Sequence, residues 1–236
     1  MSAIPPEAVA ATPKSVARKG IWVGVATGAY GISYGALAVA AGLNLWQAVL
    51  LSLLLFSGGS QFALVGVIGA GGSGASAVGT STLLGLRNGF YGLQVSKLLQ
   101  ETGWRRVLAA QLTIDESTAV SITQPDRTLS RVGFWWTGLS VYVLWGSMSA
   151  VGAVLGNAMG DPARFGLDAA APAAFCALVW SRLNNRRAQL VAVAAGLIAL
   201  LVSPHTASGI PVLVAALAAV VAGFLPDRSI TSADTI

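Results

Sequence analysis

Residues 44–70, NLWQAVLLSLLLFSGGSQFALVGVIGA, carry the pattern that decides the fold. The stretch is apolar over a length that would span a bilayer, since a membrane helix needs roughly 20 such residues. It is interrupted at Phe56-Ser57-Gly58-Gly59-Ser60-Gln61-Phe62, where paired glycines, serines and a glutamine are poor helix formers. Freed backbone groups at membrane depth must be buried in protein or face water. The sequence therefore predicts a broken membrane helix around residues 56–62.

The composition of the whole chain agrees with a membrane protein. Of its 236 residues, 55% are hydrophobic and only 10% are charged, against about 25% charged in soluble domains. The length allows about six or seven membrane segments of roughly 20 residues each. We expect an all-α, polytopic transmembrane helical bundle.

The apolar runs divide the chain into three parts. We expect a polar tail at residues 1–20, one transmembrane domain at residues 21–226 and a short polar tail at residues 227–236. The expected membrane segments, with a more polar stretch at 104–125, are 21–41, 44–70, 75–99, 132–157, 167–183, 187–203 and 208–225.

The net charge of +5 is spread over short basic clusters between the apolar runs. Cytoplasmic loops are rich in Lys and Arg, so this pattern indicates loops and not a nucleic-acid surface. Lys14, Arg18 and Lys19 place the N-terminus in the cytoplasm. Lys97, Arg105 and Arg106 fall on the same side only if residues 44–70 form a re-entrant pair of half-helices. The alternative is that residues 104–125 also cross the membrane, and the enrichment of Lys and Arg in cytoplasmic loops then fails at this point.

Arg87 is the strongest candidate for a functional residue. It lies with Asn88 deep in an apolar run, where a charge costs at least ~2.5 kcal/mol and normally faces a cavity and a partner. At helical spacing, one side of this helix carries a polar stripe of Ser76, Thr80, Arg87, Tyr91 and Gln94. A guanidinium can hold a carboxylate through two parallel hydrogen bonds. The alternative is a structural ion pair with Asp115 or Glu116, and the two roles are compatible.

Other polar residues complete the candidate site. Asp115 lies among apolar residues and suits proton coupling, with Glu116 beside it, unless both acids lie on a surface helix. Ser60 and Gln61 lie beside the backbone of the broken helix, where transporters often bind substrate near the middle of the membrane. The alternative is that the glycines of the break serve only helix packing. Tyr30 would line a cavity or pack in the interior. Asp168 would cap a helix or touch substrate.

Four of these motifs, in this order, resemble the AzlC family, the large subunit of branched-chain amino-acid exporters that includes the YgaZ-type proteins. The resemblance covers roughly residues 15–225 and rests on Gly59-Ser60-Gln61-Phe62, Leu86-Arg87 with Tyr91-Gly92, Thr113 with Asp115-Glu116, and Leu167-Asp168 with Pro172-Ala173 and Phe175. The chain departs from the family pattern at Gly85, where Asn is expected, at Asn88, where His is expected, and by inserting Ile114.

The resemblance implies a secondary transporter in the bacterial inner membrane that exports branched-chain or similar amino acids. It also implies a small membrane partner of the AzlD type. The site would comprise Arg87, Ser60, Gln61, Tyr91, Asn88, Tyr30 and Asp168 for substrate, with Asp115 and Glu116 for proton coupling. We expect no cofactor, no metal, no nucleic acid and no enzymatic activity, and a homo-oligomer is compatible with the sequence. The alternative function is a passive channel or a permease subunit for another small solute.

Overall fold

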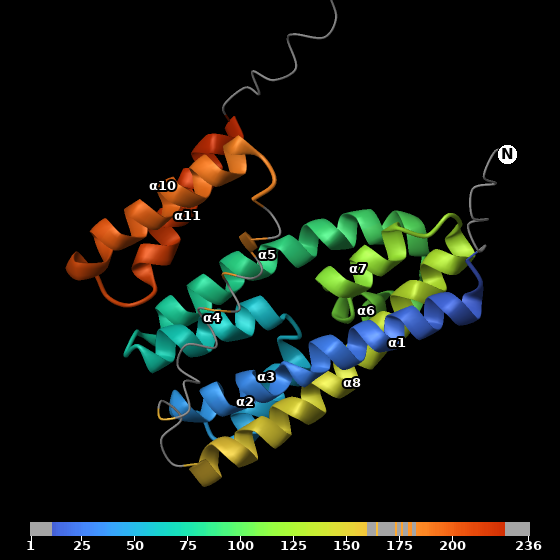
Figure 1. Cartoon of the computed structure of the whole chain (residues 1–236), viewed down its shortest axis with the longest axis horizontal. Helices are drawn as coiled ribbons and strands as arrows, with labels where there is room; N and C mark the ends of the chain where they lie inside the picture. Colours follow the sequence, from blue (N-terminus) through green and yellow to red (C-terminus); the bar gives the residue numbers. More distant parts are fainter. Residues whose placement is uncertain are drawn as a thin grey trace, which may run out of the picture.

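The computed structural model describes residues 11–159, 164, 173, 176, 179–180 and 183–224. Every regular element in this part of the chain is a helix (Figure 1), as the sequence predicts. The helices are α1 (Pro13–Ala29), α2 (Gly31–Ala40), α3 (Leu45–Leu54), α4 (Gly58–Gly69), α5 (Gly74–Leu99), α6 (Gly103–Gln111), α7 (Asp115–Ile122), α8 (Arg127–Met159), α10 (Arg186–Val202), the 3₁₀ turn η3 (Ser203–His205) and α11 (Ile210–Phe224).

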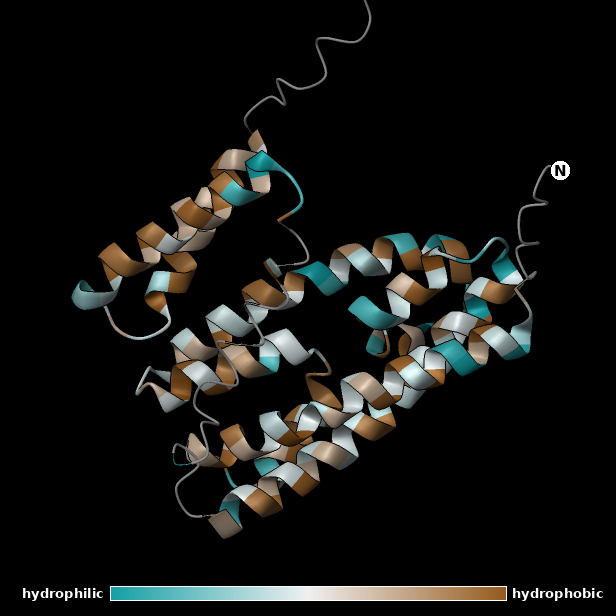
Figure 2. Ribbon diagram, in the orientation of Figure 1, coloured by the Kyte–Doolittle hydropathy of each residue, from teal (hydrophilic) through white to brown (hydrophobic). Residues whose placement is uncertain are grey.

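Within the part of the chain that the structure describes, three helices are long and apolar enough to cross a membrane, namely Pro13–Ala40, Arg127–Met159 and Arg186–His205. Shorter apolar helices are α3, α4 and α11. Hydrophobic positions run along the whole bundle (Figure 2), and large apolar side chains such as Trp46, Phe90 and Leu200 are more than two-thirds exposed. An exterior of this kind is suited to lipid.

The first helix starts earlier than the sequence predicts. Thr12 and Ser15 form a capping box, and Pro13 occupies the first turn, where its missing N–H costs nothing. The predicted tail of residues 1–20 therefore ends in a helix from residue 13 onward. The predicted segment 167–183, with Asp168, and the tail 227–236 lie outside the described residues, apart from isolated positions of that segment.

The framework of the bundle is a parallel pair made of α1–α2 and α8. Glycines on both helices allow the backbones to touch: a Cβ on Gly20 would lie 2.9 Å from the amide nitrogen of Thr137, and one on Gly31 would lie 2.8 Å from the carbonyl oxygen of Trp145. From α8, a Cβ on Gly156 would lie 3.0 Å from Cα of Ala36. Small residues at close helix crossings are the usual means of association in membranes.

Helices α3 and α4 form a re-entrant hairpin. Asn44 caps α3, which ends at Leu54, and α4 begins after Leu55-Phe56-Ser57 and turns back. A Cβ on Gly69 at the end of α4 would lie 3.3 Å from Cβ of Ala41, which precedes α3. Both ends of the hairpin therefore lie at one end of the bundle, which confirms the re-entrant alternative. The break is displaced from the predicted 56–62 to 55–57, because both glycines fit into the first turn of α4, where backbone N–H groups have no helical partner.

Helices α6 and α7 form a second re-entrant hairpin, which the sequence analysis did not predict. The chain breaks at Leu112-Thr113-Ile114, and the hydroxyl of Ser117 donates to the carbonyl of Leu112 at 2.7 Å. At the other end of α7, Ser121 donates to the carbonyl of Ser130 in the first turn of α8. The alternative that residues 104–125 cross the bundle is therefore wrong. Because α5 joins the outer ends of the two hairpins, they enter from opposite ends.

The tips of the two hairpins meet in the interior. The side-chain amide of Gln111, at the end of α6, donates to the carbonyl of Leu53 at 2.8 Å, and the hydroxyl of Tyr142 donates to the same carbonyl at 3.2 Å. Gln61 donates to the carbonyl of Leu51 at 2.9 Å and accepts from the indole of Trp145 at 2.8 Å. Side chains from three other helices thus donate to carbonyls in the last turn of α3, where Leu53 has no helical partner and Leu51 also accepts from the Leu55 amide.

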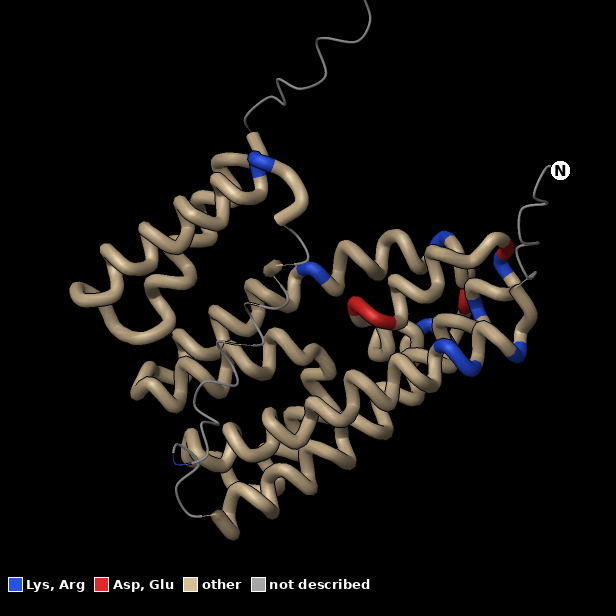
Figure 3. Tube along the Cα trace, viewed as in Figure 1, with Lys and Arg blue, Asp and Glu red and all other residues tan. Residues whose placement is uncertain are grey.

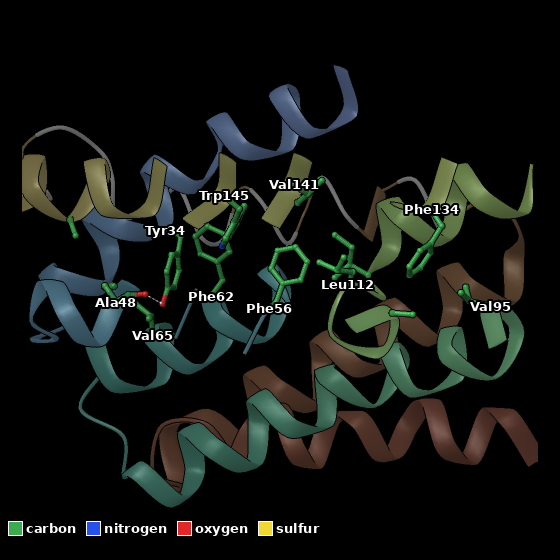
Figure 4. Close-up of a cluster of buried hydrophobic side chains, with 14 of the residues drawn as sticks. Tyr34, Ala48, Phe56, Phe62, Val65, Val95, Leu112, Phe134, Val141 and Trp145 are labelled. Atoms are coloured by element: carbon green, nitrogen blue, oxygen red, sulfur yellow. Dashed lines mark hydrogen bonds between the residues drawn. The ribbon is translucent and has the colours of Figure 1, made fainter. Parts of the chain in front are cut away.

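Aromatic side chains fill the core beside this junction (Figure 4). Tyr34 is fully buried, and its ring lies edge-on to Phe62 with centroids 5.8 Å apart and stacks on Trp145 at 6.0 Å. The Tyr34 hydroxyl donates to the carbonyl of Ala48 at 3.4 Å. The cluster holds α2, α3, α4 and α8 together and fixes the first hairpin.

Basic residues gather at the end of the bundle where α1 begins (Figure 3). There, Arg131 donates to Glu101 at 2.6 Å, and Glu101 also accepts from the indole of Trp135 at 3.2 Å. These bonds tie the loop between α5 and α6 to the start of α8. Lys97, Arg105 and Arg106 therefore lie at the same end as Lys14 and Arg18, which removes the conflict in the charge pattern.

Candidate functional site

Arg87 of α5 lies between the N-terminal ends of the two half-helices α4 and α7. Its Nη1 is 3.1 Å from Oδ2 of Asp115, the first residue of α7. On the other side, a Cβ on Gly59 in the first turn of α4 would lie only 2.9 Å from its Nη2. The guanidinium occupies space that Gly59 leaves open because it has no side chain.

The charges around Arg87 are arranged to favour an added anion. Helix N-termini carry partial positive charge, and α4 has no acidic residue in its first turn and no side-chain cap. The positive charge of Arg87 is unfavourable beside two helix N-termini, and the acids that offset it are Asp115 and its neighbour Glu116 at the start of α7. A carboxylate from outside would meet a guanidinium and open backbone amides together.

Several buried polar atoms near this point have no hydrogen-bond partner in the described residues. They are Nε of Arg87, Oδ1 of Asn88 and Oγ1 of Thr118, the last one turn beyond Asp115 on α7. Buried polar groups are nearly always paired, so orphaned ones indicate that water or a ligand completes the site.

A cavity of about 910 Å³ opens beside the Arg87–Asp115 pair. One wall consists of Gly59, Leu84, Arg87, Tyr91 and Asp115, from α4, α5 and α7. The opposite wall comes from α10 and α11 and is mostly alanine and glycine. Such a volume lies at the upper end of small-molecule sites, which span about 300–1,000 Å³. Apolar walls with a few converging polar groups are typical of a binding site.

The comparison with protein families agrees with this geometry. Residues 23–159 match the family described as AzlC protein. The chain belongs to the AzlC family. This family is of the transporter type, and the match contains both re-entrant hairpins, Arg87 and Asp115. Neither a curated protein nor a solved structure matches the chain.

Some of the site residues predicted for this AzlC protein come together around the cavity. Arg87, Tyr91 and Asp115 all line it. Asn88 follows Arg87 with its orphaned oxygen, and Glu116 follows Asp115 in the first turn of α7. The structural ion pair that the sequence offered as an alternative is present, so any ligand of Arg87 would share it with Asp115.

Other predicted residues lie away from the cavity lining. Ser60 and Gln61 are both fully buried. The hydroxyl of Ser60 accepts from the hydroxyl of Ser57 at 3.1 Å, and both ends of the Gln61 amide are bonded to protein. Tyr30 packs its ring against Phe62 with centroids 5.2 Å apart. These three residues support the first hairpin in this structure. Asp168 lies outside the described residues.

Most of the lining residues were not predicted from the sequence, among them Gly59, Asn185 and Arg187. Gly59 was noted only as part of the break, and Arg187 falls in one of the short basic clusters that the charge pattern assigns to loops. Arg187 lines the cavity from α10 and donates to the carbonyl of Ala222, while Asn185 caps the same helix. A useful signal for Arg187 was its position in a first helical turn, where a cation opposes the helix dipole.

Proposed function

We propose that this AzlC protein exports branched-chain or similarly apolar amino acids, with Arg87 holding the substrate carboxylate. The observation that carries the proposal is the position of Arg87 at two helix N-termini, beside an acid and a largely apolar cavity. A carboxylate fits the guanidinium and the amides, an aliphatic side chain fits the walls, and Asp115 can face the ammonium group.

Asp115 links binding to the proton gradient in this scheme. In this structure its Oδ2 lies 3.1 Å from Nη1 of Arg87. An arriving carboxylate competes for the guanidinium, which leaves Asp115 to take the ammonium group or a proton, with Glu116 as the second acid. Binding of this kind shifts a conformational equilibrium because the substrate contacts differ between the two states.

The two opposed hairpins supply the moving parts of the proposed mechanism. Transporters with discontinuous helices often bind substrate near the midplane and alternate access around that site. Here α3–α4 approaches from one end and α6–α7 from the other, and they meet at Gln111 and Leu53. Opening one hairpin at a time would expose Arg87 to one side of the membrane only.

The proposal extends to orientation and partner. The basic end of the bundle would face the cytoplasm of a bacterial cell, with the N-terminus inside and the chain in the inner membrane. The chain would act as the large subunit beside a small AzlD-type membrane protein, which supports or completes the path.

Counterflow of radiolabelled leucine in proteoliposomes tests the proposal. The chain is reconstituted alone and with a co-expressed small partner, with and without an imposed pH gradient. We expect leucine flux that responds to the gradient, is lost in Arg87→Ala and no longer responds to pH in Asp115→Asn. Arg105→Ala, an exposed arginine at the end of the bundle, is the matched control and should transport normally.

Two results would count against the proposal. Flux in Arg87→Ala equal to that of Arg105→Ala, at equal protein levels, would remove the carboxylate role. Leucine flux that ignores both the pH gradient and a proton uncoupler would instead favour a passive channel.

A further inference from the structure

The middle of the cavity wall opposite Arg87 carries mostly small apolar side chains, while Asn185 and Arg187 line it near the start of α10. On α10 these are Ala188, Ala192 and Ala195, whose spacing of four and three residues places them on one helix face. Ala219 and Ala222 face the same cavity from α11. The cavity has its volume because none of these positions carries a larger side chain.

Away from Arg187 and Asn185 at the start of α10, the polar groups of the cavity lie on the wall opposite the alanines. Arg87 and Asp115 lie on the wall formed by α5 and α7, whereas the middle of the α10 face offers only methyl groups. A carboxylate bound at Arg87 therefore fixes one end of a substrate on the polar wall and directs its apolar part across the cavity. This wall lies outside residues 23–159, which match the family.

We propose that the α10–α11 wall is the subsite for the substrate's apolar side chain and that Ala192, at the middle of the α10 face, sets the largest side chain accepted. The inference rests on the proposed function, because it takes Arg87 as the carboxylate anchor. The ligand class is an aliphatic amino acid, whose side chain is received in place of water. One methylene in an apolar pocket changes discrimination by about 10–200-fold, so a small change in this wall is measurable.

A matched pair of alanine substitutions tests the wall through substrate size. Ala192→Phe places a ring in the cavity, whereas Ala194→Phe, two residues along the same helix, falls on the exposed outer face. In proteoliposomes, Ala192→Phe should lower leucine transport relative to alanine transport by about tenfold or more. Ala194→Phe should keep the wild-type ratio. An unchanged ratio in Ala192→Phe, or an equal change in both variants, would overturn the inference.

Thiol labelling tests the same wall without relying on transport. The only cysteine, Cys176, is first replaced by serine, and Ala192→Cys and Ala194→Cys are made in that background. A water-soluble thiosulfonate should label Ala192→Cys, and leucine should slow that labelling. Ala194→Cys should stay slow, because a thiol in lipid does not ionise to the reactive thiolate.

The two experiments separate failure of the inference from failure of the proposed function. A wild-type chain that moves no amino acid refutes the proposed function. Ala192→Cys that resists the reagent, or that reacts no faster than Ala194→Cys, refutes the subsite whatever the transport result. Labelling of Ala192→Cys that leucine slows supports both.

Discussion

Replacing Gly59 by alanine should weaken substrate binding by displacing Arg87. The added Cβ would lie 2.9 Å from Nη2 of Arg87, closer than two such atoms can approach, so the guanidinium must move by about half an ångström or more from its place at the start of α4. The loss of one charge-assisted hydrogen bond to a carboxylate is worth about 1.5–3 kcal/mol. This corresponds to a rise of about tenfold or more in the Kd for substrate.

Folding should be nearly unaffected by this change. The atom that must yield is the end of a flexible side chain, and alanine is the better helix former by about 1 kcal/mol. Gly66→Ala on the same helix is the control, because a Cβ there meets nothing within 4 Å. Leucine binding and thermal unfolding of both variants are measured in detergent. Equal Kd values for Gly59→Ala, Gly66→Ala and wild type would refute the placement of Arg87 at the substrate.

Three further predictions concern stability and are checked by thermal unfolding. Gly31→Ala should lower the free energy of unfolding by about 1–3 kcal/mol, because it forces α2 away from the α8 backbone, while Gly196→Ala, which has open space, should not. Gln111→Leu removes one of the two donors to the Leu53 carbonyl, and because Tyr142 still donates to it, the loss should be about 0.5–1.5 kcal/mol; stability equal to wild type would show that the hairpin tips need no such bond. Glu101→Gln keeps a hydrogen-bond acceptor but removes the negative charge that faces Arg131, whose side chain is 36% exposed. The free energy of unfolding should therefore fall by less than the about 3–5 kcal/mol that breaking a fully buried ion pair costs, and a larger fall would contradict this.

The class of fold was readable from the sequence, and so was the first break. Long apolar runs with few charged residues fit only a bundle of membrane helices, and paired glycines between serines mark the place where a helix stops. The exact break at 55–57 was not readable, because glycine is tolerated equally well in an irregular segment and in a first helical turn.

The second hairpin escaped prediction for a different reason. Its break, Leu112-Thr113-Ile114, contains no glycine or proline, so no local signal opposes a helix there. The turn is stabilised by tertiary contacts instead, with Ser117 bonded to the carbonyl of Leu112 and Gln111 bonded to the other hairpin. Tertiary context overrides local propensity at such places.

The charged residues of the candidate site could be predicted because they lie within apolar stretches of the sequence. Arg87 and Asp115 stood out because charges within apolar runs require partners, and the structure pairs them. Ser60 and Gln61 looked similar in sequence, yet they bond to protein at the hairpin core. Polar residues near a helix break can serve the break itself, and only the fold shows which do so.

Competition by substrate analogues tests whether Arg87 binds the substrate carboxylate. Displacement of bound radiolabelled leucine by unlabelled leucine and by leucinamide, which lacks the carboxylate, is compared in wild type and Arg87→Ala. We expect wild type to prefer leucine over leucinamide by about tenfold or more, the value of one charge-assisted bond, and Arg87→Ala to lose this preference. A preference that survives intact in Arg87→Ala would show that Arg87 does not bind the carboxylate.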